Sequence, residues 1–370
     1  MSGNVVYESF AKMEAFMKDV FVKVGVPEAD AAICAEVLIE SDKRGIDSHG
    51  VGRFKPIYID RIKDGIQNPV TNFEIVKDGL ATAVVDGHDG MGHVIGKKSM
   101  QMALDKAKKY GMGMVVVRNS THYGIAGYYA TMATRAGMIG ITGTNARPSI
   151  APTFGIENML GTNPLTVGMP SDEDFPFVLD CATSVSQRGK IEHYDRIGKT
   201  MPKGWVIDTQ GNSETDPAIA LEGLTKGTAA LAPLGGLGDE TAGYKGYGYA
   251  TVVEILSAAL QQGTFLKALN GIDAAGKKIP YHLGHFFMAI DISAFVELDK
   301  FKKTTGDILR ELRASKKMPG YDRIYTAGEK EYLAWLDRKD RGVPLNESLK
   351  KTIKQLKDEY KLDSYSFSFC

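Results

Sequence analysis

A histidine and an arginine near residue 50 are the residue types in this sequence best suited to chemistry on a carbonyl group. His49 stands in the segment Asp47-Ser48-His49-Gly50, and Arg53 follows four residues later. Imidazole exchanges protons near neutral pH, and a ketone that is reduced by hydride must gain a proton at oxygen. The planar guanidinium of Arg53 can hold a carboxylate through two hydrogen bonds. The pair therefore favours hydroxy-acid or keto-acid chemistry, although a loop histidine followed by a surface arginine would show the same spacing.

A second histidine stands in a similar setting. His122 lies in Asn119-Ser120-Thr121-His122-Tyr123-Gly124, directly after the strand-like run Met114-Val115-Val116-Val117. Loops that follow buried strands are favoured places for sites. Two more segments, Gly161-Thr162-Asn163-Pro164-Leu165 and Leu179-Asp180-Cys181-Ala182-Thr183-Ser184, mix small residues with hydrogen-bonding ones. Amides and hydroxyls of the second can cradle a pyrophosphate, but such clusters also commonly cap helices.

Together these segments resemble the type-2 malate/L-lactate dehydrogenase family of NAD(P)-dependent 2-hydroxy-acid oxidoreductases. The resemblance covers roughly residues 41–321 and continues through four more segments: Gly204-Trp205-Val206-Ile207-Asp208, Pro233-Leu234-Gly235-Gly236, Tyr244-Lys245-Gly246-Tyr247-Gly248 and Gly284-His285-Phe286-Phe287. Within the family, residues 237–243 are similar to the version found in malate and sulfolactate dehydrogenases. The resemblance implies a hydride transfer between NAD or NADP and L-malate or L-lactate.

The resemblance also implies a fold and an assembly. We expect a mixed α/β protein in which a sheet-rich, non-Rossmann cofactor domain, residues 121–289, is inserted into a helical, substrate-side domain formed by residues 1–120 and 290–370. Relatives are homodimers, so a homodimer is expected here.

Site roles follow from the same resemblance. It implies that His49 and His122 are catalytic, with His49 as the general acid/base and His122 as its rival, and that the substrate binds to Arg53, Thr162 and Asn163. It further implies that the cofactor binds to Asp180, Cys181, Ala182, Thr183, Ser184, Lys245 and His285. From the residues alone, Lys245 is a solvated loop lysine and the Phe286-Phe287 pair is core. Lys190, His193 and Tyr194 face the adenosine end or form a solvated turn.

The run Gly90-Met91-Gly92-His93-Val94-Ile95-Gly96 imitates a dinucleotide-binding glycine loop. Its third glycine comes one position late for G-x-G-x-x-G, and the next strand ends in Arg118-Asn119 without an acidic residue. A late glycine with a basic residue downstream can mark NADP binding. Because relatives bind the dinucleotide on an unrelated fold, we interpret these glycines as a structural turn.

Composition excludes several classes of protein. At 370 residues the chain can form two or three domains, and its 45 basic and 45 acidic residues create no net field for nucleic acid or an anionic membrane. Three cysteines, Cys34, Cys181 and Cys370, cannot all pair, which favours a reducing compartment. No H-E-x-x-H or C-x-x-C spacing occurs, so no metal is expected. Charges in the first thirty residues and the lack of an 18-residue apolar run predict a soluble, cytoplasmic protein.

Periodic apolar residues predict the secondary structure. Helices are expected over residues 7–24, 27–41, 52–65, 96–110, 125–136, 250–261, 298–315, 328–339 and 346–360. Strands are expected over residues 73–76, 83–85, 114–117, 138–142, 165–169, 177–179, 205–207 and 286–290. The polar tail, residues 364–370, is not expected to join the core.

Two alternatives to a malate or lactate dehydrogenase stay open. One is a dehydrogenase of another keto or imino acid, such as sulfopyruvate, ureidoglycolate, diketogulonate or piperideine carboxylate. The other is a catalytically silent dinucleotide-binding protein, against which the intact His49, Arg53 and His122 argue.

Overall fold

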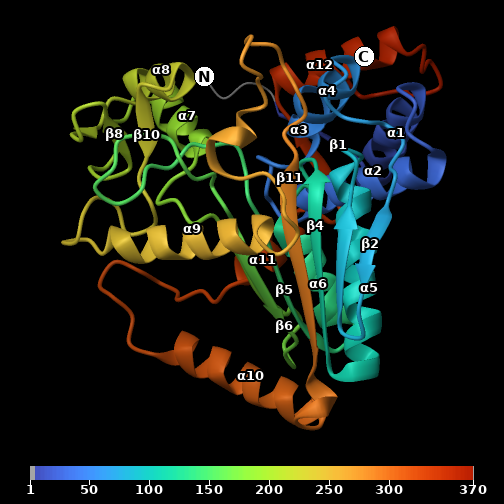
Figure 1. Ribbon diagram of the computed structural model, residues 1–370, viewed down its shortest axis with the longest axis vertical. Helices are drawn as coiled ribbons and strands as arrows, with labels where there is room; N and C mark the ends of the chain where they lie inside the picture. The colour runs from blue at the N-terminus through green and yellow to red at the C-terminus, as the bar shows by residue number, and fades with distance from the viewer. Residues whose placement is uncertain (1–4, 370) are drawn as a thin grey trace.

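A seven-stranded mixed sheet forms the centre of the molecule in the computed structural model, which describes residues 5–369 (Figure 1). The strand order is β2-β3-β4-β11-β5-β6-β7, and only β3 and β4 pair in parallel. The strands are β2 Glu74–Asp78, β3 Thr82–Asp86, β4 Met112–Ser120, β5 Met138–Thr144, β6 Leu165–Met169, β7 Phe177–Cys181 and β11 Leu283–Asp291. This arrangement confirms the predicted mixed α/β class.

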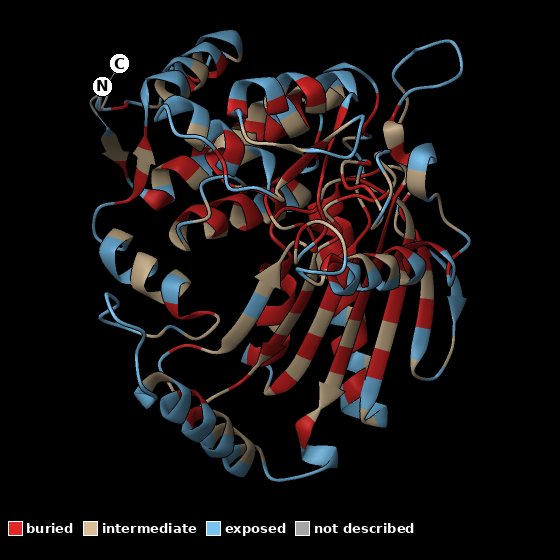
Figure 2. Cartoon of the chain, turned by 90° about the vertical axis from the view of Figure 1, so that its left-hand side faces the viewer, coloured by how far each residue is buried: buried red, intermediate tan, exposed pale blue. Residues whose placement is uncertain are grey.

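Helices cover both faces of the sheet because successive strand residues point to opposite sides. On β11, Phe287 packs with α5 (Gly92–Tyr110) and α6 (Ala126–Arg135), whereas Phe286 packs with Val253 of α9 (Gly243–Ala258). Figure 2 shows buried and less buried residues alternating along the strands. The sheet therefore lies between two helical layers.

The two ends of the chain build one helical unit. Its core joins side chains of the N-terminal helices to Val343, Leu345 and Ile353, and a two-stranded antiparallel sheet pairs Val6 with Leu345. The elements are β1 Val6–Glu8, α1 Phe10–Lys23, α2 Glu28–Lys43, α3 Val51–Arg53, the π-helix η1 Phe54–Ile59, α4 Asp60–Lys63, β12 Val343–Leu345 and α12 Glu347–Glu359.

The prediction that the tail stays outside the core is wrong for its described part. Phe367 is buried and stands edge-on to Phe16 of α1, with ring centroids 5.2 Å apart. Aromatic residues alternate with serines in Tyr365-Ser366-Phe367-Ser368-Phe369, so one face of this polar-looking stretch is apolar. Cys370 lies outside the described residues.

A third, smaller unit surrounds a three-stranded sheet in the order β10-β8-β9. The sequence indicated only its first strand. The unit contains β8 Val206–Asp208, β9 Ser213–Glu214, β10 Ala229–Leu231, α7 Arg188–Arg196, α8 Pro217–Lys226 and the 3-10 helix η2 Leu266–Asn270. Lys190, His193 and Tyr194 therefore lie on a helix and not in a turn.

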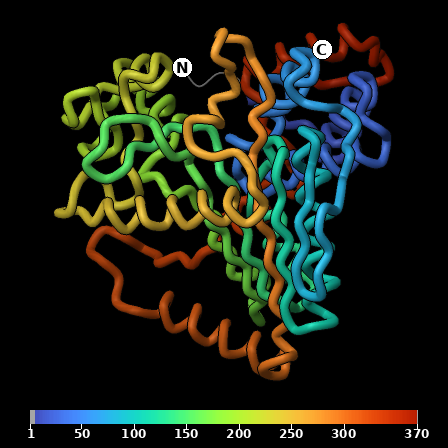
Figure 3. Tube along the Cα trace, viewed as in Figure 1, coloured from blue at the N-terminus to red at the C-terminus, as the bar shows by residue number. Residues whose placement is uncertain are grey.

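After β11 the chain forms an arm, which the trace in Figure 3 follows in orange beyond the end of the sheet. The arm contains the 3-10 helix η3 Ile292–Ala294 and α10 Leu298–Ala314, and the chain then returns to the helical unit through α11 Glu329–Arg338. Ile308 and Leu312 of α10 are each 54% exposed. No helix among residues 5–369 is long and apolar enough to cross a bilayer.

The central sheet joins strands from both of the predicted domain ranges. β2, β3 and β4 precede residue 121, and β11 pairs with β4 on one side and with β5 on the other. The ranges 1–120 with 290–370, and 121–289, stay predictions for the substrate and cofactor sides. Strand pairing does not separate them.

Candidate active site

The loop that carries His49 is fixed by buried contacts at both of its ends. Asp42, buried on α2, accepts a hydrogen bond from the amide of Val51 at 2.8 Å. Arg338 of α11 donates to the carbonyl oxygen of Asp42 at 2.8 Å and to the Asp47 carboxylate at 3.0 Å. A Cβ atom on Gly50 would lie 2.2 Å from the Asp42 carboxyl group, so only glycine fits there. Helices distant in sequence thus position His49.

The structure brings the two predicted catalytic histidines together. Their rings stack with centroids 5.8 Å apart at an interplanar angle of 22°. Tyr58, from η1, lies 2.6 Å from Nδ1 of His122 through its hydroxyl oxygen, and the buried His93 packs against the other side of Tyr58 at 4.5 Å. Tyr58 and His93 have no predicted role in the sequence. A signal for Tyr58 was its position five residues after Arg53 on a predicted helix.

The hydrogen bonds of His122 define which nitrogen carries its proton. The amide of Gly124 donates to Nδ1 of His122 at 3.2 Å, and an amide can only donate. Nδ1 is therefore unprotonated, Tyr58 donates its hydroxyl hydrogen to the same atom, and the ring proton is on Nε2. Burial, and then the charges of His49 and Arg61, hold the pKa of His122 well below its ordinary value. His122 is thus a neutral hydrogen-bond donor.

His49 has a different electrostatic setting. Burial and the Arg53 charge lower its pKa, but the Asp180 carboxylate acts in the opposite direction. Nδ1 of His49 lies 2.8 Å from the hydroxyl of Ser48, which can donate or accept. Protonation of His49 therefore breaks no fixed hydrogen bond. Protonation of His122 at Nδ1 would instead place its N–H against the N–H of Gly124.

Arg53 ends the short helix α3 and remains next to His49. Its Nε donates to the Ser48 carbonyl oxygen at 2.6 Å. Within the described residues its two terminal nitrogens have no acidic partner. They are available for the carboxylate fork that the sequence predicted.

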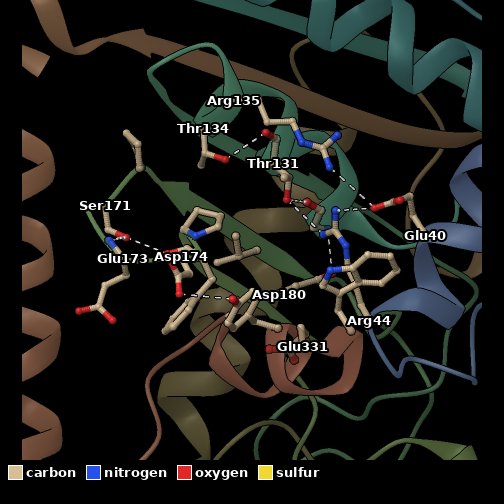
Figure 4. Close-up of a pocket in the computed structure, with 18 of the residues that line it drawn as sticks. Glu40, Arg44, Thr131, Thr134, Arg135, Ser171, Glu173, Asp174, Asp180 and Glu331 are labelled. Atoms are coloured by element: carbon tan, nitrogen blue, oxygen red, sulfur yellow. Dashed lines mark hydrogen bonds and ion pairs between the residues drawn. The ribbon is translucent and has the colours of Figure 1, made fainter. Parts of the chain in front are cut away.

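Asp180 is the residue before the last one of β7, and it contacts the start of α6. Its Oδ2 accepts from the Gly127 amide at 2.7 Å and its Oδ1 from the Thr166 hydroxyl at 3.0 Å. Figure 4 shows Asp180 on the wall of a cavity of about 650 Å³, in which Arg44 lies between Glu40 and Thr131. This side chain therefore acts on His49 and on α6, and its predicted contact with the cofactor stays a prediction.

The remaining residues predicted at the cofactor, except His285, gather where the segment after β7 approaches Leu234 and the start of α9. The amide of Leu234 donates to the Thr183 carbonyl oxygen at 2.8 Å, and a Cβ on Gly246 would lie 2.1 Å from the carbonyl oxygen of Leu234. Within the described residues, the buried hydroxyls of Ser184 and Ser186 have no hydrogen-bond partner. Free hydroxyls beside a glycine-rich helix start fit the phosphates of a dinucleotide.

Lys245 lies at this place but not in the predicted loop. α9 begins at Gly243, so Lys245 stands in its first turn, exposed, with its ammonium 5.8 Å from the Tyr244 ring centroid. The sequence pattern placed the start of this helix near Ala250, because three glycines within Gly243–Gly248 hide the periodicity. Cys181, the last residue of β7, and Ala182, which follows it, are both half-buried.

Thr162 and Asn163 join the cofactor-side segment and not the histidines. The amide of Thr183 donates to the Thr162 carbonyl oxygen at 2.9 Å. Asn163, fully buried, donates to the Glu254 carboxylate at 2.7 Å and so ties this segment to α9. The structure therefore favours a supporting role for Asn163 over the predicted contact with substrate.

His285 is enclosed by protein side chains, and its predicted contact with the cofactor stays a prediction. It is fully buried, and its ring nitrogens lie 2.8 Å from the Thr144 hydroxyl and 2.7 Å from the Ser120 hydroxyl. Its ring stacks on Tyr123 at 4.5 Å. Because both nitrogens are occupied, His285 supports the strand that leads to His122.

The glycine run at residues 90–96 is a packing feature, as interpreted from the sequence. A Cβ on Gly92 would lie 2.3 Å from the Thr121 carbonyl oxygen, and the Gly92 amide donates to the Thr121 hydroxyl at 2.9 Å. The start of α5 therefore presses against the backbone next to His122. No space for a pyrophosphate is left at Gly92.

The site combines two neighbouring histidines, an arginine beside them and a bend suited to binding phosphates, which together fit a dehydrogenase. A sequence model of the malate/L-lactate dehydrogenase family matches residues 9–354. The chain belongs to this family. This confirms the resemblance noted in the sequence, and it makes the protein a dehydrogenase.

Individual members of the family are similar over nearly the whole chain. The chain is 44% identical over 334 residues to the malate dehydrogenase of Pyrococcus horikoshii, with 90% of each chain covered. It is 40% identical to the L-sulfolactate dehydrogenase of Methanocaldococcus jannaschii, with 93% of this chain and 94% of that one covered. The crystal structure of malate dehydrogenase from Entamoeba histolytica has a TM-score of 0.94 at 46% identity and covers 99% of this chain and 100% of that one.

Proposed function

We propose that this dehydrogenase interconverts a 2-hydroxy acid and its 2-keto acid, with L-malate and oxaloacetate as the main pair, and uses NAD or NADP. The pairing of a neutral His122 with a protonatable His49, next to the free fork of Arg53, is the observation that supports it best. The malate dehydrogenases among the relatives support the choice of substrate. L-lactate and sulfolactate are the next candidates.

The residues of this chain divide the reaction between them. Arg53 binds the carboxylate next to the reacting carbon through its free terminal nitrogens. Nε2 of His122 donates a hydrogen bond to the carbonyl oxygen, which polarises it. His49 delivers the proton to that oxygen during reduction and removes it during oxidation. A substrate carboxylate at Arg53 neutralises one of the charges that lower the pKa of His49, so substrate binding favours protonated His49.

The cofactor, when bound, donates or accepts the hydride. The unpartnered hydroxyls of Ser184 and Ser186 and the first turn of α9 with Lys245 would hold its phosphates. We do not assign a metal to the site; the described residues bring no three metal-binding side chains together. The choice between NAD and NADP rests on residues around the ribose.

We also propose that the protein works as a homodimer in the cytoplasm. The exposed apolar residues Ile308 and Leu312 of α10 offer a surface for a second copy. Cys34 and Cys181 are both free thiols, which suits a reducing compartment.

Absorbance of reduced nicotinamide, followed with oxaloacetate, NADH and NADPH, tests this function. We expect His49→Ala to lower kcat by ~10²-fold or more, the usual size for loss of a general acid/base. His122→Ala should also lower kcat, but His122→Asn, which keeps a donor, should recover part of it. If kcat is instead recovered in His49→Asn relative to His49→Ala, the roles assigned to the two histidines would be reversed. Absence of any oxidation of reduced cofactor by the wild type with 2-keto acids would refute the function.

A further inference from the structure

We propose that Arg61 and Arg147 bind a second acidic group of the substrate, so that the site selects keto acids with an acidic group at both ends. The inference rests on the proposed function and extends it to a part of the site that the reacting groups do not include. The acidic group is a carboxylate or a sulfonate, because both present oxygens that match a guanidinium.

Both arginines line one cavity of about 1060 Å³. Arg61 is half-buried on α4, eight residues after Arg53, and Arg147 is exposed in the segment that follows β5. The cavity therefore receives one cation from α4 and one from the segment after β5.

The other charged side chains on the cavity wall are already neutralised. Its three carboxylates each bind a lysine of the same wall: Lys55 with Asp60 at 2.8 Å, Lys278 with Asp64 at 2.7 Å, and Lys267 with Glu157 at 3.0 Å. Lys226, also on the wall, pairs with Glu222. Among the described residues, Arg61 and Arg147 have no carboxylate partner. The cavity thus presents two uncompensated positive charges.

The charges of these two arginines also act on each other. Burial is the largest cause that lowers the pKa of Arg61, and the charges of Arg147 and Arg53 lower it further by smaller amounts. Arg61 lies over the Tyr281 ring, with the guanidinium carbon 4.5 Å from the ring centroid. This contact fixes the orientation of the guanidinium group. Like charges held near each other without a counterion cost free energy, and an anion between them removes that cost.

The position of Arg61 relates this anion to the reacting groups. Its charge is among the causes that lower the pKa of His122, after burial and His49, and it also acts on Tyr58, which bonds to His122. In oxaloacetate the second carboxylate is two bonds from the reacting carbon, so the cation that binds it must lie close to the reacting groups, and the charge of Arg61 acts on His122. The predicted phosphate contacts lie elsewhere, between β7 and the start of α9, which argues against a cofactor phosphate here.

Substrate selectivity tests the proposal. Initial rates of the purified full-length protein are measured with oxaloacetate, sulfopyruvate and pyruvate, using Arg147→Gln, Arg61→Gln and, as a control from the same wall, Lys226→Gln. We expect Arg147→Gln to lower kcat/KM for the two diacids by ~10²-fold, the size expected for a lost charge-assisted fork, and for pyruvate by less than ~3-fold. Lys226→Gln should match the wild type. A fall for only one diacid identifies the carboxylate or the sulfonate as the natural group.

Three results would overturn the proposal. One is an unchanged ratio of oxaloacetate to pyruvate in Arg147→Gln, and another is an equal loss with all three keto acids. The third is a raised KM for NADPH alone, which would make the arginines a cofactor site. Arg147 is exposed, so its variant should fold even where Arg61→Gln does not, and its thermal midpoint checks this. A wild type that reduces oxaloacetate without this selectivity refutes only the second-anion site, whereas a wild type inactive with every keto acid refutes the proposed function itself.

Discussion

At the scale of single residues, two histidines in similar sequence settings have different environments. Both follow small hydroxyl residues, and both were predicted as acid/base candidates. The difference comes from Tyr58 and the Gly124 amide, which both donate to Nδ1 of His122, while Nδ1 of His49 meets only a rotatable hydroxyl. No spacing rule predicts this, because it depends on how η1 turns Tyr58 toward His122. The sequence therefore predicts which residues meet, and the fold assigns their tautomers.

Tyr58→Phe tests that assignment. Without the phenol hydroxyl, Nδ1 of His122 loses a donor, so its neutral form is less stabilised and the pKa of His122 rises. We expect kcat to fall ~10-fold, as for the loss of one hydrogen bond of ~1.5 kcal/mol, and the pH profile of kcat to move upward. Cofactor affinity should not change. Tyr128→Phe, which removes a hydroxyl bonded to Glu36, is the control. An unmoved pH profile would mean that Tyr58 only fills space.

Asp42 makes the stability of the His49 loop depend on pH. Burial raises its pKa from an ordinary 3.8 to about 8. Between these values the folded protein holds a proton that the unfolded chain has lost, so the free energy of unfolding falls as pH rises through this window. The loss is on the order of 6 kcal/mol across the whole window. Below pH 4 the contribution is fully present.

Chemical denaturation at pH 5 and pH 8.5 measures this effect. Asp42→Asn, which cannot ionise, should remove most of the difference, and Asp358→Asn, at an exposed position on α12, should keep it. Equal slopes for the wild type and Asp42→Asn would contradict the prediction. Activity should fall above pH 8 in the wild type, since ionised Asp42 disturbs the loop that holds His49.

At the scale of elements, prediction from sequence is strongest where one face of an element is apolar. α1, α2, α5 and the central strands lie within a few residues of their expected bounds. α9 was predicted to start near Ala250, because glycines at its beginning are poor helix formers. These glycines are needed because other backbone segments approach closely: Gly243 lies against the carbonyl oxygen of Gly236, and Gly246 lies against that of Leu234. Such a constraint comes from distant residues and is invisible in local periodicity.

Two glycines of α9 give a matched test of this approach. Gly246→Ala places a Cβ against Leu234, so we expect a loss of ~1 to 3 kcal/mol in stability from overpacking, together with weaker cofactor binding. Gly248→Ala, with nothing within 4 Å, should instead gain ~0.5 to 1 kcal/mol from helix propensity and leave cofactor affinity unchanged. Thermal melts and fluorescence titration with NADH separate the two. Similar behaviour of both variants would show that the helix start is not held against Leu234.

At the scale of the whole molecule, the N-terminal and C-terminal segments pack together, and the central sheet links the segments that lie between them in the sequence. Buried residues between Phe10 and Ile59 share one core with buried residues between Val343 and Phe367, which no local sequence pattern could reveal. The sheet then continues from β4 through β11 to β5, so the histidines are supported from both predicted domains. Ile308 and Leu312 on α10 stay exposed among residues 5–369, which raises the question of whether another chain covers them.

We expect a second copy of this chain to cover that face. Ile308 and Leu312 are four residues apart on α10, next to the buried Leu309, so they form one exposed stripe. Asp at either position would place a charge in an apolar interface, which costs several kcal/mol, and should shift the protein from dimer to monomer in sedimentation velocity. Lys303→Gln changes the net charge by the same amount elsewhere on the helix and should leave the dimer intact. A wild type that sediments as a monomer at micromolar concentration, or Ile308→Asp and Leu312→Asp variants that stay dimeric, would exclude α10 as the contact.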